Sequence, residues 1–99
     1  MKKILLVCNA GMSTSMLVAK MKKAAQADGV EVSIEAKSLA DAKKEIQEAN
    51  IVLLGPQIRY ELENVKKLVG SVPVEAIDMR DYGMMNGEKV LKHAMEVMG

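Results

Sequence analysis

Apolar and polar residues follow two patterns along this chain, one typical of strands and the other of helices. Residues 4–7 are a continuous apolar run, which predicts a strand buried on both faces, and residues 51–54 are a second such run. In residues 30–35 apolar and polar side chains alternate, which predicts a strand with one less buried face, at a sheet edge. Residues 72–77 predict a weaker strand, because Pro73 is tolerated only near a strand start or on an edge.

Between these runs, apolar residues recur at helical spacing. The apolar side of the first predicted helix has five members, Leu17, Val18, Met21, Ala24 and Ala25. Gly29 supplies its end. Ser38 begins a motif like a capping box, which predicts a short helix through Ala49. Pro56 begins a third helix that Gly70 ends, and Asn86 is the expected N-cap of the closing helix.

The resulting order is β-α-β-α-β-α-β-α, without repeats, low-complexity segments or a linker. Successive parallel strands are joined by right-handed helical crossovers. The sequence therefore predicts an α/β fold, a doubly wound sandwich with a four-stranded parallel sheet and helices on both faces. A length of 99 residues suits one domain, spanning residues 1–99.

Composition and charge narrow the function classes. Fourteen Lys and Arg face thirteen Asp and Glu, and only two residues are aromatic, so neither the basic surface nor the stacking platform of a nucleic-acid binder is evident. A single cysteine excludes an internal disulfide and fits a reducing cytosol. The run at 4–7 is shorter than a signal-peptide core, and no stretch approaches the roughly 20 residues of a membrane span. We expect a cytoplasmic protein whose membrane role, if any, comes through a partner.

The one cysteine, Cys8, follows the first buried strand and precedes a small, polar segment. In parallel α/β sheets ligands bind beyond the carboxyl ends of strands where the strand order reverses. A thiolate facing a helix N-terminus is a strong nucleophile, and the N–H groups of a Gly/Ser/Thr loop suit a phosphoryl group. The predicted phosphate-binding loop has seven members, Asn9, Ala10, Gly11, Met12, Ser13, Thr14 and Ser15. Gly11 permits a tight turn or close approach, and one of the three hydroxyl residues is expected to be the helix N-cap.

The strand-end rule brings further segments toward Cys8. The expected lining consists of Ser38 with its neighbours, the turn Gly55, Pro56 and Gln57, and residues 78–83 with Tyr82. Within 78–83, Asp78 and Asp81 are candidate acids. Arg59 and Arg80 are interpreted as solvated cations, and His93 as solvated or structural. We expect no metal site and no cofactor.

The residue six positions after the cysteine separates two chemistries. Low-molecular-weight tyrosine phosphatases have an arginine there, whose guanidinium clamps the phosphate and stabilises the transition state. This chain has Thr14, so hydrolysis is disfavoured. On the residues alone three hypotheses stay open: a phosphoryl carrier, a phosphatase-like hydrolase, and a non-catalytic module that binds an anion or nucleotide.

Three segments carry a family resemblance: CNAGMSTSMLV at 8–18, VLLGPQI at 52–58 and PVEAID at 73–78. Together they closely resemble the enzyme IIB component of the bacterial sugar phosphotransferase system, in its lactose/cellobiose/chitobiose branch. The resemblance implies a phosphotransferase in which Cys8 becomes phosphocysteine and residues 9–15 cradle the phosphate. It further implies that the donor is phosphohistidine on the IIA protein. The acceptor would be a sugar of the cellobiose/chitobiose type, held by the membrane transporter IIC, with which the protein associates transiently at the inner membrane face.

Overall fold

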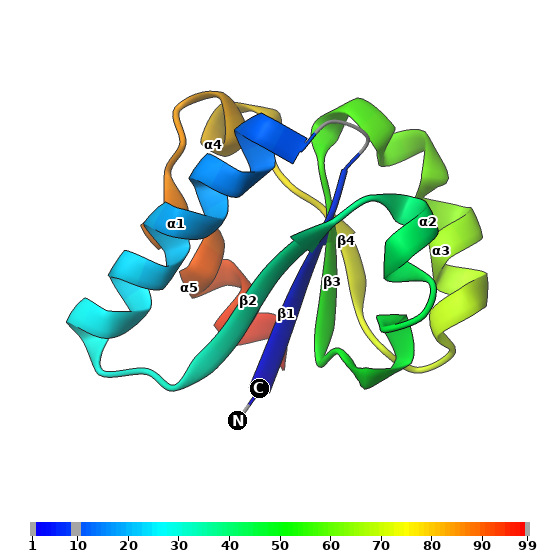
Figure 1. Cartoon of the computed structure of the whole chain (residues 1–99), viewed down its shortest axis with the longest axis horizontal. Coiled ribbons are helices and arrows are strands. Elements are labelled where there is room, and N and C mark those ends of the chain that lie inside the picture. Colours follow the sequence, from blue (N-terminus) through cyan, green and yellow to red (C-terminus); the bar gives the residue numbers. More distant parts are fainter. Residues whose placement is uncertain (1, 9–10, 99) are drawn as a thin grey trace.

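The structure is a computed structural model that describes residues 2–8 and 11–98. For residues 11–13 it describes the backbone alone. Its four strands are parallel and form one sheet in the order β2-β1-β3-β4 (Figure 1). The strands are β1 (Lys2–Val7), β2 (Val32–Lys37), β3 (Ile51–Leu54) and β4 (Val74–Ala76). The predicted parallel α/β fold is thereby confirmed, and β2 lies at an edge, as expected. Strand β4 forms the other edge, with Pro73 directly before its first residue.

Helices cover both faces of this sheet, as predicted (Figure 1). One face carries three helices, α1 (Gly11–Asp28), α4 (Met79–Gly83) and α5 (Gly87–Met98). The other carries α2 (Leu39–Ala42) and α3 (Leu62–Val69), with the 3₁₀ helices η1 (Ile46–Glu48) and η2 (Pro56–Glu61).

Strand β1 contributes to the core on each side. Ile4 and Leu6 pack with the α1 and α5 layer, whereas Leu5 and Val7 pack with the α2 and α3 layer. All four side chains are fully buried, because successive residues of a strand point to opposite faces and helices cover both. This is the burial that the continuous apolar run predicted.

The helices differ from the prediction in several places. The segment from Pro56, expected as one helix up to Gly70, begins as the 3₁₀ helix η2, and α3 starts only at Leu62. The expected helix over 38–49 is wrong: Ser38 caps α2 through its Oγ, which accepts from the Asp41 N–H at 3.3 Å, but α2 ends at Ala42 and η1 follows. Residues 78–83 were expected only as a lining segment, but 79–83 form α4. Asp78 caps it, since its Oδ1 accepts from the N–H groups of Arg80 at 2.8 Å and Asp81 at 3.2 Å.

The chain reverses its direction of travel across the sheet at β1. It runs from β1 to β2 on one side and then returns to β3 on the other. The carboxyl end of β1 is therefore the switch point where ligands bind in such sheets. Strand β1 begins at Lys2 at the opposite end of the molecule, and α5 runs back toward that same end (Figure 1).

Candidate functional site

Cys8 lies at the switch point, directly after β1. Its N–H donates to the carbonyl of Lys37 at 3.1 Å, which extends the β1–β2 pairing by one residue, and its side chain is buried, with 4% exposed. Helix α1 begins three residues later, at Gly11. The first N–H groups of a helix lack intrahelical partners, and the positive end of its dipole attracts anions. The fold thus sets the thiol beside the N-terminus of an 18-residue helix.

The predicted loop after Cys8 is shorter than expected. Asn9 and Ala10 lie outside the described residues, while Gly11 to Ser15 belong to the first turns of α1. The expectation that Ser13, Thr14 or Ser15 is the N-cap is therefore wrong, because all three follow the start of the helix. The N–H groups that lack intrahelical partners are those of the first turn, so residues 11–13, rather than Thr14 and Ser15, form the amide-rich end of α1.

Gly55, at the end of the neighbouring strand β3, lies close to the thiol. It follows β3, and its N–H donates to the Val7 carbonyl at 2.8 Å. A Cβ at this position would lie 3.2 Å from Cys8 Sγ and 2.9 Å from Gln57 Oε1. The turn therefore does more than end a strand, since only glycine leaves the sulfur its present space.

The Gln57 side chain reaches the thiol. Cys8 Sγ donates to Gln57 Oε1 at 3.8 Å, a long contact that sulfur's size allows. An amide carries both a donor and an acceptor, so the same side chain suits a thiol or, turned over, a thiolate. Pro56 lies between Gly55 and Gln57 but lines a different hollow, described below.

Thr14, the residue in place of the phosphatase arginine, is held inside the molecule. It is 1% exposed, and its Oγ1 lies 3.2 Å from the hydroxyl oxygen of Tyr82, which is itself buried. This hydrogen bond joins α4 to the first turns of α1. The structure thus brings Tyr82 to the site through Thr14.

A cavity of about 260 Å³ opens beside the thiol at the ends of β1 and β2. Seven residues line it: Cys8, Thr14, Ser15, Ala36, Lys37, Ser38 and Asp41. The predicted contribution of Ser38 is confirmed. Its neighbour Lys37, at the carboxyl end of β2, lines the cavity as well, although nothing in the sequence singled it out.

The remaining candidates gather away from the thiol. Arg59 and Arg80, both exposed as predicted, line a separate groove with Pro56, Asp78 and Asp81. Asp78 is engaged as the α4 cap. Neither aspartate lines the cavity at Cys8, so the structure does not bring the candidate acids to the sulfur.

His93, expected to be solvated or structural, is exposed and also links two elements. Its Nε2 lies 2.5 Å from Glu75 Oε1, linking α5 to β4, and this hydrogen bond raises the pKa of His93. Across residues 2–8 and 11–98, no group of three or more His, Cys, Asp or Glu side chains is placed to hold a metal ion. In the same part of the chain, no helix is long and apolar enough to cross a membrane.

The fold and this site define a parallel α/β sandwich with a cysteine at its switch point. Residues 3–93 match the family model described as the lactose/cellobiose-specific IIB subunit of the PTS. The chain belongs to this family. It is therefore a phosphotransferase of a sugar transport system, and components of this family work with IIA and IIC components.

Individual relatives agree with this assignment. The oligo-beta-mannoside-specific EIIB component of Bacillus subtilis (strain 168) is 44% identical, over 99% of this chain and 97% of the relative. The cellobiose-specific EIIB component of Lactococcus lactis subsp. lactis (strain IL1403) is also 44% identical, over 98% and 96%. So is the galactose-specific EIIB component of Lactococcus lactis subsp. cremoris (strain MG1363), over the same shares.

Solved structures show the same fold. The solution structure of the cellobiose-specific IIB component from Borrelia burgdorferi has a TM-score of 0.81 at 39% identity and covers 98% of this chain and 91% of that one. The lactose-specific IIB domain from Streptococcus pneumoniae also has a TM-score of 0.81, at 17% identity, over 96% and 95%. At 17% identity the second likeness concerns the fold alone.

Proposed function

We propose that this chain, acting as one IIB domain over residues 1–99, carries a phosphoryl group on Cys8. In the first step the Cys8 thiolate attacks the phosphorus of phosphohistidine on IIA. The S–P bond forms, the P–N bond breaks, and its electron pair stays on the imidazole nitrogen. In the second step a sugar hydroxyl held by IIC attacks phosphorus, the S–P bond breaks and the thiolate is restored, while the hydroxyl proton leaves to solvent or a base.

The position of Cys8 is the observation that carries this proposal. The thiol lies at the switch point, beside the start of α1 and next to a cavity. A phosphoryl group brings about two negative charges, which the N-terminal N–H groups and dipole of a helix stabilise without a metal ion. We assign the phosphate contacts to the backbone of residues 9–15, with Gly55, Gln57 and Tyr82 as supporting residues.

The hydrolase hypothesis has less support. Thr14 occupies the position where the phosphatases have arginine, and its hydroxyl is engaged with Tyr82. Arg59 and Arg80 line another groove, so within the described residues no guanidinium lines the cavity at the thiol. A site that binds a phosphoryl group but lacks the charge that stabilises hydrolysis suits a carrier, which holds the group until an acceptor arrives.

For the acceptor we propose a β-disaccharide of the cellobiose or chitobiose type, during uptake through IIC. Three relatives with names for different sugars share the same 44% identity with this chain. This is consistent with a sugar that is bound by IIC rather than by the IIB component. The protein would then work in the cytoplasm and meet the membrane transiently, through IIC.

The test is incubation with phosphorylated IIA, followed by intact-mass and peptide analysis. We expect one phosphoryl adduct, on Cys8, and none in Cys8→Ser or Cys8→Ala. Circular dichroism and a melting curve serve as the folding control, because these substitutions change the side chain by little volume. An adduct at another residue, or none on the wild-type protein, would overturn the proposal.

Two further measurements separate the alternatives. A hydrolase would turn over an aryl phosphate, and Cys8→Ser would lose that turnover. A non-catalytic module would bind inorganic phosphate or a nucleotide equally well after Cys8→Ala. The carrier proposal expects neither result.

A further inference from the structure

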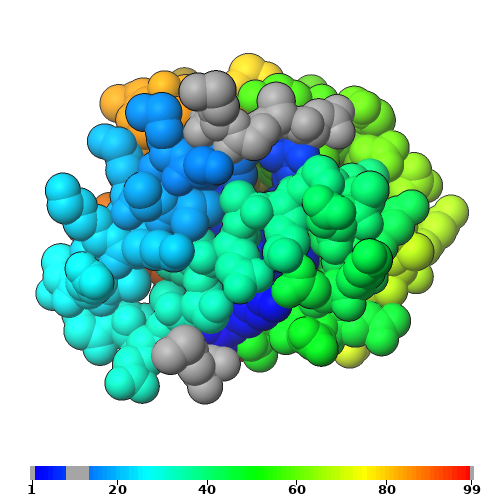
Figure 2. Space-filling model, in the orientation of Figure 1, coloured from blue at the N-terminus to red at the C-terminus, as the bar shows by residue number. Residues whose placement is uncertain are grey.

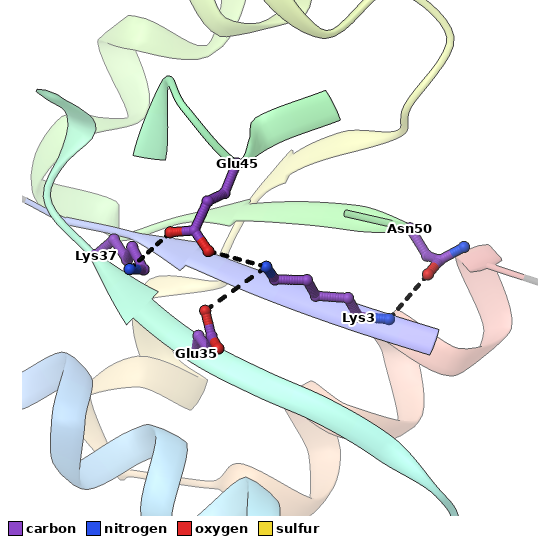
Figure 3. Close-up of polar contacts among 5 residues, drawn as sticks. All are labelled: Lys3, Glu35, Lys37, Glu45 and Asn50. Carbon is purple, nitrogen blue, oxygen red and sulfur yellow. Dashed lines mark hydrogen bonds and ion pairs between the residues drawn. The ribbon is translucent and has the colours of Figure 1, made fainter. Parts of the chain in front are cut away.

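A group of charged residues lies on the sheet face next to the Cys8 cavity. Lys37 Nζ lies 2.6 Å from Glu45 Oε2, and the other oxygen of Glu45 lies 3.1 Å from Lys3 Nζ (Figure 3). Lys3 Nζ also lies 3.7 Å from Glu35 Oε2. In Figure 2, side chains of β1 are visible on this face between β2 and the segment that carries α2 and η1. Glu45 thus has two lysine partners, from two different strands.

Lys37 belongs both to this group and to the site. Its carbonyl accepts the hydrogen bond from the Cys8 N–H at 3.1 Å, and the residue lines the cavity beside the thiol. Among the described residues that line this cavity, Lys37 is the basic one and Asp41 the acidic one. A phosphoryl group arriving there would add about two negative charges near the Asp41 carboxylate.

We propose that Lys37 exchanges its ion pair with Glu45 for one with the phosphoryl group on Cys8. This inference rests on the proposed function, because it needs phosphocysteine at Cys8. Lysine suits such an exchange, since its ammonium is a point charge with three rotatable donors on a flexible four-carbon stem. Glu45 is not left alone when Lys37 moves, because Lys3 still holds its other oxygen.

The balance of the two pairings favours the exchange. The side chains of Lys37 and Glu45 are 35% and 27% exposed, and an ion pair so accessible to water contributes little to stability. A phosphoryl group offers three oxygens and a larger charge than one carboxylate, so its charge-assisted hydrogen bonds are stronger. Lys37 therefore pairs with Glu45 while Cys8 is unphosphorylated, and with the phosphoryl group once Cys8 is phosphorylated.

The test compares two variants that break the same ion pair. Dilute phosphorylated IIA is mixed with each IIB variant, and intact mass gives the phosphorylated fraction of both proteins at equilibrium. At high dilution this partition depends on the two separate proteins and not on how they dock. For Lys37→Met we expect the transfer equilibrium to fall by about threefold to tenfold, on the scale of one partly exposed charged hydrogen bond. For Glu45→Gln we expect it to rise by about twofold, since Lys37 loses its competing partner.

Opposite signs are the result that a structural role would not give. If the Lys37–Glu45 pair only stabilised the fold, both substitutions would lower the phosphorylated fraction or leave it unchanged, and either result would overturn the inference. Lys3→Met is the matched control. Lys3 also pairs with Glu45 but does not line the cavity, so we expect its loss to leave the transfer equilibrium unchanged. Lys37→Arg should retain most of the wild-type value. If the wild-type protein takes no phosphoryl group at Cys8, the proposed function itself is wrong. If the wild-type protein and all variants are phosphorylated to the same extent, the proposed function stands and only the role of Lys37 is wrong.

Discussion

At the scale of single residues, the site depends on a missing side chain as much as on the thiol. Gly55 and Cys8 come from the ends of adjacent strands, and the space that a Cβ would fill at Gly55 is the space next to sulfur. The sequence suggested the turn at Gly55 from its Gly-Pro pair, but it did not show that the glycine leaves room for the thiol. That requirement follows from strand register, which pairs Val7 with Leu54 and so sets the next two residues side by side.

We predict that Gly55→Ala slows phosphorylation of Cys8 by about tenfold while the fold persists, because a small displacement of a reacting atom has a large effect on rate. The new methyl group would meet Gln57 Oε1 at 2.9 Å and Cys8 Sγ at 3.2 Å. The measurement is the rate of phosphoryl uptake from phosphorylated IIA by rapid quench and mass analysis. Adding Gln57→Ala removes the first contact and keeps the second. If the double variant regains the rate of Gln57→Ala alone, the crowding at sulfur is not the cause.

At the scale of elements, periodicity predicted which residues face the core better than it predicted how the backbone is hydrogen-bonded. Ala42, Ile46 and Ala49 are buried, as their helical spacing indicated, yet the segment consists of the short helices α2 and η1. Both helix types turn a side chain inward every three or four residues, so the pattern does not separate them. Helix α4 was missed because five residues after an Asp cap are too few for an apolar period to appear.

The contact between α1 and α5 depends on Gly87, the first residue of α5. A Cβ there would lie 2.6 Å from the Met21 nitrogen and 2.7 Å from the Lys20 carbonyl carbon, which are backbone atoms that cannot rotate away. We predict that Gly87→Ala lowers the free energy of unfolding by about 1–3 kcal/mol, the usual effect of overpacking. Urea denaturation measures it. Gly83→Ala is the control, since its new Cβ would meet no other described residue within 4 Å beyond its chain neighbours and its own helix backbone. Equal stability of the two variants would refute the close-packing account.

At the scale of the whole molecule, β1 unites the two cores, since its side chains enter each in turn. The sequence predicted this central strand, the edge strand β2 and the position of Cys8 at the end of β1, because burial patterns and the switch-point rule act over the whole sheet. It did not predict the role of Lys37. A lysine on a less buried strand gives no sign of its partners until the fold brings Glu45 beside it.

We predict that Leu5→Ala and Leu6→Ala each lower the free energy of unfolding by about 2–5 kcal/mol, although they open cavities in different cores. Each variant should still unfold in one transition, because neither layer keeps its sheet without β1. Denaturation followed by circular dichroism, with Leu68→Ala as the more exposed control, tests this. Two separate transitions in either variant would mean that the layers fold independently.

The direction of β1 also decides how this protein can be attached to something else. Lys2 and Cys8 lie at opposite ends of the strand, about 20 Å apart at 3.3 Å per residue, and α5 ends on the Lys2 side (Figure 1). A tag or a surface joined near Lys2 or near the end of α5 therefore leaves the thiol accessible to a partner protein. A fused partner that must itself reach Cys8 needs a flexible linker of at least about 15 residues, whose average span matches that distance.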